Sequence, residues 1–157
     1  MRAKASQLVA LLLCAFALAA ADDQPLDALK AQAQREDAPR LYAEVVRRQV
    51  EVANDFYTAG DVEKAEATIQ ELVSFSDKCL QSAQTRGERN LKSTEITLYK
   101  AGRRLEEVRR SLNFEDQPKV QDAVEAIEKT RRGVLNIMFG KKEKEKKPDD
   151  KAEESRQ

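Results

Sequence analysis

The sequence predicts an all-α protein in which antiparallel helical hairpins form either a four-helix bundle or a short array of hairpins. Apolar residues recur at steps of three and four positions over most of residues 39–140, which is the spacing of one helix face. This pattern is interrupted at Gly60 and Asp61. A glycine can adopt the positive φ that closes a helix, and an aspartate side chain can cap the helix that follows.

The first residues of the chain have the composition of a secretory signal peptide. A basic start at Arg2 and Lys4 precedes an apolar run that ends in small alanines before Asp22. A membrane-spanning helix needs about 20 apolar residues, which is more than this run provides. We therefore expect residues 1–21 to be cleaved and the mature protein to be exported to the periplasm or the extracellular space. A retained membrane anchor is the alternative.

Residues 22–38 are expected to form a weakly helical or flexible N-terminal segment. Leu26 and Leu29 give it only a thin apolar stripe, so docking onto the rest of the protein remains an open question. Asp37 is expected to cap the first long helix, with Pro39 in its first turn.

Residues 39–140 are expected to form one helical domain. Three helices predicted from the apolar spacing run over 39–59, 62–83 and 88–112, and a fourth follows the turn at residues 113–118 and ends at Gly140. Gly60 is expected to require a positive φ, whereas Gly102 is expected to be an ordinary mid-helix glycine that costs about 1 kcal/mol relative to Ala. On this basis, Gly60→Val would be far more damaging than Gly102→Val.

The predicted turn and its flanks resemble the centre of a tetratricopeptide-repeat helical hairpin. The resemblance rests on Ala53, Tyr57, Gly60 and Ala65, which match the small, aromatic and turn residues of that family. It is limited to about residues 53–73. What it implies is a pair of closely packed antiparallel helices at this point of the chain.

Composition excludes several classes of chemistry. The chain has no His, and without residues 1–21 it has a single cysteine, Cys79. Zinc sites built from Cys and His and all His-based general bases are therefore excluded. The five glycines are scattered singly and provide no phosphate-binding loop. We expect no catalytic residues, no metal site and no cofactor, and thus no enzyme.

Charge is distributed unevenly along the expected mature chain. Residues 22–83 carry 7 basic and 13 acidic side chains, whereas residues 84–140 carry 12 basic and 9 acidic ones. The total is close to neutral, which argues against a dedicated nucleic-acid-binding protein. Two halves of opposite charge are expected to attract each other within the domain.

The third predicted helix carries the candidate partner-binding residues. They form a basic stripe that comprises Arg89, Lys92, Lys100, Arg103 and Arg110. One interpretation is a solvated face that pairs with itself, because Arg103–Glu107 and Glu106–Arg110 are each one turn apart. The other interpretation is a binding surface for an acidic partner or a polyanion.

Cys79 lies on the same predicted helix stripe as Leu72 and Leu80. The spacing favours a buried position, where a cysteine behaves as a small hydrophobic residue. The alternative is an intermolecular disulfide, because a lone cysteine in an oxidising compartment has no partner in its own chain. That alternative would make the protein a homo-oligomer.

Residues 141–157 contain mainly Lys, Glu and Asp and are expected to form a disordered charged tail. The junction over residues 137–142 changes from apolar to basic and could instead anchor the protein to a membrane surface. The sequence as a whole predicts an exported helical module for protein–protein interaction or scaffolding, with an unknown partner. Peripheral binding of a polyanion or membrane surface through the third helix and the tail is the alternative.

Overall fold

The computed structural model describes residues 24–87 and 91–145, and every regular element within these ranges is an α-helix. The helices are α2 (Leu26–Glu36), α3 (Pro39–Thr58), α4 (Val62–Arg86), α5 (Leu91–Ser111) and α6 (Gln117–Glu145). The prediction of an all-α fold is confirmed. The predicted signal peptide and residues 146–157 of the predicted tail lie outside the described residues.

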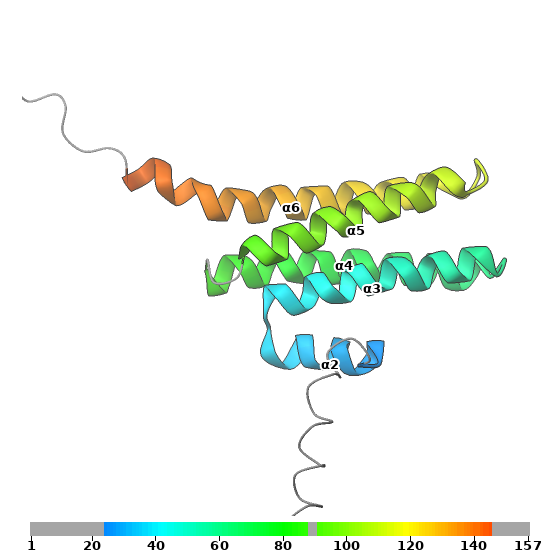
Figure 1. The fold of residues 1–157 in the computed structure, drawn as a ribbon, viewed down its shortest axis with the longest axis horizontal. Coiled ribbons are helices and arrows are strands. Elements are labelled where there is room, and N and C mark those ends of the chain that lie inside the picture. The colour runs from blue at the N-terminus through cyan, green and yellow to red at the C-terminus, as the bar shows by residue number, and fades with distance from the viewer. Residues whose placement is uncertain (1–23, 88–90, 146–157) are drawn as a thin grey trace, which may run out of the picture.

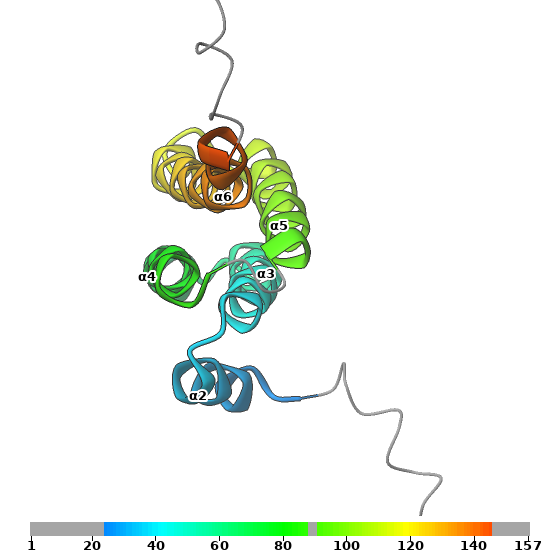
Figure 2. The ribbon, with the colours of Figure 1, turned by 90° about the vertical axis from the view of Figure 1, so that its left-hand side faces the viewer.

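The helices form two antiparallel hairpins, α3–α4 and α5–α6, that stack on each other (Figure 1). Helix α3 packs against α5 and helix α4 packs against α6, and both pairs run in parallel (Figure 1). In an up-and-down bundle, consecutive helices are neighbours, which would place α4 beside α5. The end-on view instead shows layers, with α2 below α3–α4 and α5–α6 above them (Figure 2). The arrangement is therefore the array of hairpins, while the resemblance to tetratricopeptide repeats stays a prediction.

The turn between α3 and α4 has the predicted geometry. Gly60 adopts a φ of +78°, in the left-handed region that favours glycine. The Asp61 side chain accepts a hydrogen bond from the Lys64 backbone N–H at 3.4 Å, at the start of α4. This cap satisfies one of the N–H groups that have no partner within the helix.

Helix α2 is docked on α3, which answers the question left open by its thin apolar stripe. Leu29 is 4% exposed and Ala33 is fully buried. The Lys30 ammonium reaches across to the Glu71 carboxylate of α4 at 2.7 Å, and the buried Gln49 amide donates to the same carboxylate oxygen at 2.7 Å. Apolar burial and a polar contact together hold α2 at this end of the stack.

The prediction that Asp37 caps α3 is wrong. Asp37 ends α2 with a φ of +47°, and its own N–H donates to the Ala33 carbonyl. Aspartate tolerates this left-handed conformation better than most residues. The conformation directs Asp37 toward the end of α4, where its carbonyl accepts from Ser82 at 2.6 Å and its carboxylate pairs with Arg86 at 3.4 Å. The N-cap position of α3 is Ala38, which has no side-chain cap.

Gly102 is not the ordinary mid-helix glycine that the sequence predicts. It is buried where α5 meets α6, and a Cβ atom there would lie 3.2 Å from Glu128 Oε1 and 3.5 Å from Ile127 Cγ2. The branched side chain of valine would extend further toward Ile127. Gly102→Val therefore disturbs a helix contact, and the expectation that Gly60→Val would be far more damaging is withdrawn.

The contact between α4 and α6 depends on small residues that sequence reasoning did not single out. A Cβ atom at Gly133 would lie 2.5 Å from Leu80 Cδ1, so the missing side chain allows the two helices to approach. Beside this contact, Ser76 Oγ donates to Thr130 Oγ1 at 2.9 Å, and both residues are buried. A satisfied hydroxyl pair in the interior fixes the relative position of the two helices.

One boundary prediction also needs correction. Helix α6 does not end at Gly140 but continues to Glu145, because one glycine costs a helix only about 1 kcal/mol and the Lys and Glu residues that follow are good helix formers. Val62 is 36% exposed. As the first residue of α4, it lies at the end of the layer next to the turn.

Candidate partner-binding surface

The structure divides the five residues of the predicted basic stripe into three groups. Lys92, Lys100 and Arg103 are exposed on α5, and no carboxylate of the described residues lies within ion-pair distance of them. Arg110 is exposed but pairs with Glu106 at 3.0 Å. Arg89 lies outside the described residues.

The self-pairing that the sequence predicts for this helix is half present. The predicted Glu106–Arg110 pair is formed. The predicted Arg103–Glu107 pair is not, because Glu107 pairs with Arg104 at 3.3 Å, and Arg104 also reaches Glu51 of α3 at 3.2 Å. The competition for Glu107 leaves the Arg103 guanidinium directed to solvent.

Two apolar side chains lie among Lys92, Lys100 and Arg103. Ile96 is 41% exposed and Tyr99 is 48% exposed, although both are large enough to contribute to a core. Residues at steps of three and four positions share one face of a helix. By this spacing, Ile96 and Tyr99 lie on the same face of α5 as the three cations. We call this face the α5 outer face; it comprises Lys92, Ile96, Tyr99, Lys100 and Arg103.

Helix α6 supplies the neighbouring wall of this surface through Arg131. The Arg131 guanidinium lies 5.5 Å from the centroid of the Tyr99 ring, within the range of a cation–π interaction. It also binds Glu95 at 2.8 Å and Glu128 at 3.1 Å, and the hydrogen bond to Glu95 raises the pKa of the guanidinium. Arg131 thus neutralises both carboxylates and supports the Tyr99 ring from one side.

A third exposed apolar side chain follows on α6. Phe139 is 54% exposed and stands eight residues after Arg131 on α6. Since α6 is antiparallel to α5, these last turns of α6 run toward the first turns of α5 (Figure 1). The apolar groups of both helices therefore gather toward one end of the open layer.

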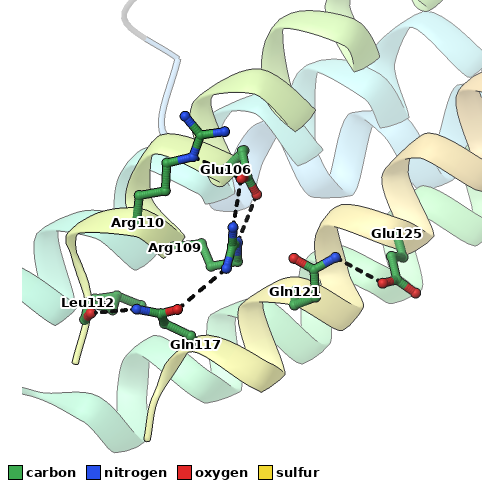
Figure 3. Close-up of polar contacts among 7 residues, drawn as sticks. All are labelled: Glu106, Arg109, Arg110, Leu112, Gln117, Gln121 and Glu125. Atoms are coloured by element: carbon green, nitrogen blue, oxygen red, sulfur yellow. Dashed lines mark hydrogen bonds and ion pairs between the residues drawn. The ribbon is translucent and has the colours of Figure 1, made fainter. Parts of the chain in front are cut away.

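The opposite end of α5 is held by a set of polar contacts (Figure 3). Glu106 accepts from Arg109 at 2.8 Å and from Arg110 at 3.0 Å, and these hydrogen bonds, led by the one from Arg109, lower the pKa of the carboxyl to about 2. Arg109 also donates to Gln117 at 3.4 Å, and Gln117 donates to the Leu112 carbonyl at 3.0 Å. The cations at this end are occupied in bracing the turn between α5 and α6.

Cys79 lies in the interior. It is fully buried, its Sγ donates to the Pro39 carbonyl at 3.3 Å, and burial raises the pKa of the thiol to about 12. This geometry supports the buried position that the helix stripe predicts. In this conformation the sulfur is not accessible to a second chain, so the intermolecular disulfide would require local opening.

Within the ranges 24–87 and 91–145, no group of three His, Cys, Asp or Glu side chains could hold a metal ion. No helix in the same ranges is long and apolar enough to cross a membrane. Comparison with known proteins finds no matching family model, no matching curated protein and no matching solved structure.

Proposed function

We propose that this protein is an exported helical module that binds a protein partner through the α5 outer face. The observation that carries the proposal is the exposure of Ile96 and Tyr99 between cations that have no acidic partner among the described residues. Export is proposed from the signal-peptide composition of residues 1–21.

The position of this face in the stack supports the proposal. Helix α2 covers the α3–α4 layer, whereas no described helix covers the α5–α6 layer on its far side (Figure 2). A contiguous exposed apolar patch rimmed by polar residues marks a candidate interaction site. Tyrosine and arginine are also the residues most enriched at the energetic centres of protein interfaces.

A photo-crosslinking amino acid placed at Tyr99 tests this proposal in cells that export the full chain. The same group placed at Asp77, an exposed residue of α4, serves as the control. We expect a discrete cross-linked protein from position 99 that is absent from position 77 and is lost in Ile96→Asp. Identical cross-linking from both positions, or none from either, would contradict a partner site on the α5 outer face.

The second candidate function is attachment to an anionic membrane surface or another polyanion. The observation in its favour is the exposed Phe139, which is followed after one residue by Lys141 and Lys142. Flotation with vesicles that contain anionic lipid separates the two functions. Binding to these vesicles that is lost in Phe139→Ser but retained in Tyr99→Ser would favour the membrane.

A further inference from the structure

We infer that the segment bound by the α5 outer face is an acidic amphipathic helix of the partner protein. This inference rests on the proposed function and adds the chemical nature of the partner. It follows from three features of the surface: its length, its unbalanced charge and the way in which the chain covers the opposite end of its own stack.

The length of the α5 outer face suits a helix. Lys92 and Arg103 bound an interval of 11 residues, which spans about 16 Å along α5, or roughly three helical turns. Ile96 and Tyr99 lie inside this interval, and Phe139 extends the apolar groups along α6. A partner helix with apolar residues on every turn could contact all three. A peptide that binds by β-strand addition would need an open sheet edge, and the described residues include no strand.

The charge of the surface selects an acidic partner. Lys92, Lys100 and Arg103 are solvated in the free protein, and burying them beneath a partner would be unfavourable without a carboxylate for each. The nearby carboxylates of Glu95 and Glu128 are both taken by Arg131. Since no carboxylate of the described residues pairs with these three cations, we take the compensating negative charge to come from the partner.

Helix α2 shows how this fold covers an open layer. It buries Leu29 and Ala33, which are one turn apart, and reaches Glu71 with the Lys30 ammonium at 2.7 Å. There, a cation of the docked helix meets an acid of the stack. At the α5–α6 end the stack provides the cations, so the docked helix must provide the acids.

The α2 helix of a second copy does not meet this requirement. Its buried apolar residues are already used against α3. Helix α2 carries two acidic side chains, Asp27 and Glu36, and two basic side chains, Lys30 and Arg35. These charges cancel, so α2 has no net negative charge to set against the cations of the α5 outer face. The partner is therefore a different segment.

Fluorescence anisotropy with designed peptides tests the inference on the full chain. The probe is a helical peptide with a leucine stripe and glutamates beside it. One matched peptide carries lysine in place of glutamate, and another has the same composition with the stripe scattered. We expect the acidic striped peptide to bind about tenfold or more tightly than either matched peptide. Equal or weaker binding of the acidic striped peptide would overturn the inference.

Protein variants then locate the binding. The double variant Lys92→Glu/Arg103→Glu is expected to weaken binding of the acidic peptide by about tenfold or more, because it replaces attraction with repulsion. The matched control is Arg35→Glu/Arg40→Glu, which makes the same charge change on exposed residues of α2 and α3. We expect less than about a twofold effect from the control, since salt screens distant charges. Equal losses in both variants would overturn the assignment to the α5 outer face.

Two further results would contradict the inference in favour of another occupant. Anionic vesicles that bind through Lys92 and Arg103 and are not displaced by the acidic peptide would indicate a membrane surface. A dimer in sedimentation analysis that dissociates in Tyr99→Ser would indicate a second copy of the chain.

A partner that cross-links at position 99 yet binds Lys92→Glu/Arg103→Glu unchanged would reject the acidic helix and retain the proposed function. Absence of any position-specific cross-link would reject the proposed function itself.

Discussion

Replacing glycine with alanine at position 102 and at position 60 makes the same chemical change in two different backbone environments. Gly102 lies in the interior of α5, whereas Gly60 closes α3 with a φ of +78°. We expect the two substitutions to change the free energy of unfolding in opposite directions. Gly102→Ala should stabilise the protein and Gly60→Ala should destabilise it.

The magnitudes follow from the local structure. In a helix interior, alanine is favoured over glycine by about 0.8–1 kcal/mol. The new Cβ at position 102 would meet Glu128 Oε1 at 3.2 Å, but this carboxylate belongs to a flexible and partly exposed side chain that can move by a few tenths of an ångström. A net gain of about 0.5 kcal/mol or more remains. At Gly60, a Cβ would meet no atom within 4 Å, so the loss is the left-handed penalty of about 1–2 kcal/mol.

Thermal unfolding followed by circular dichroism measures both effects. A change of 1 kcal/mol shifts the Tm of a domain of this size by about 3–6 °C, so the two variants should differ by several degrees. The single variant Gly140→Ala is a suitable control. Gly140 lies in the last turns of α6, and a Cβ there would have no atom within 4 Å. Equal shifts at positions 60 and 102, or a lower Tm for Gly102→Ala, would refute the assigned backbone environments.

The remaining predictions concern the interior thiol and the ion cluster near the turn between α5 and α6. Cys79 should react slowly with a water-soluble thiol reagent at pH 8 in the native protein and completely in denaturant, because it is buried and the pKa of its thiol is raised to about 12; rapid native labelling would contradict its placement. Glu106 has a lowered pKa of about 2 in the folded state against about 4.3 for an unfolded glutamate, so its contribution to stability is complete above pH 4.3 and is lost as the pH falls toward 2. Urea midpoints of the wild type and Glu106→Gln should therefore converge over that range, and a constant difference would count against the cluster.

Helix positions were accessible from the sequence because they depend on local chemistry. The turn at Gly60 and Asp61 needed only the preference of glycine for positive φ and of aspartate for a cap. The end of α6 was misplaced for the same local reason, since Gly140 was given more weight as a helix stop than its propensity supports. Asp37 was misassigned because an aspartate between two helices can serve either of them.

The pairing of helices was not accessible, because an apolar stripe shows which face is buried and not which helix covers it. The Ser76–Thr130 contact joins residues 54 positions apart, and no local pattern relates them. Gly102 and Gly133 did carry a signal. A glycine inside a strongly periodic helix often marks a close approach of another helix, and each of these two lies at such a contact.

The sequence pointed to the charged residues of the α5 outer face but not to its apolar residues. Lys92 and Arg103 belong to the predicted basic stripe, whereas Ile96 and Tyr99, which are exposed beside them, were not singled out. Which cations are free depends on the competition of Arg104 for Glu107, and this is settled by the position of Glu51 on α3. That position is a tertiary feature which the sequence does not show.

An NMR titration of the full, ¹⁵N-labelled chain tests most directly whether the α5 outer face is the binding surface. Amide shifts would be followed while the acidic amphipathic peptide, or the partner captured at position 99, is added. We predict that the perturbed amides centre on α5 between Lys92 and Arg103 and on α6 near Phe139, with little change in α2. Perturbations centred on α2 and α3, or spread evenly over the described helices, would contradict the account.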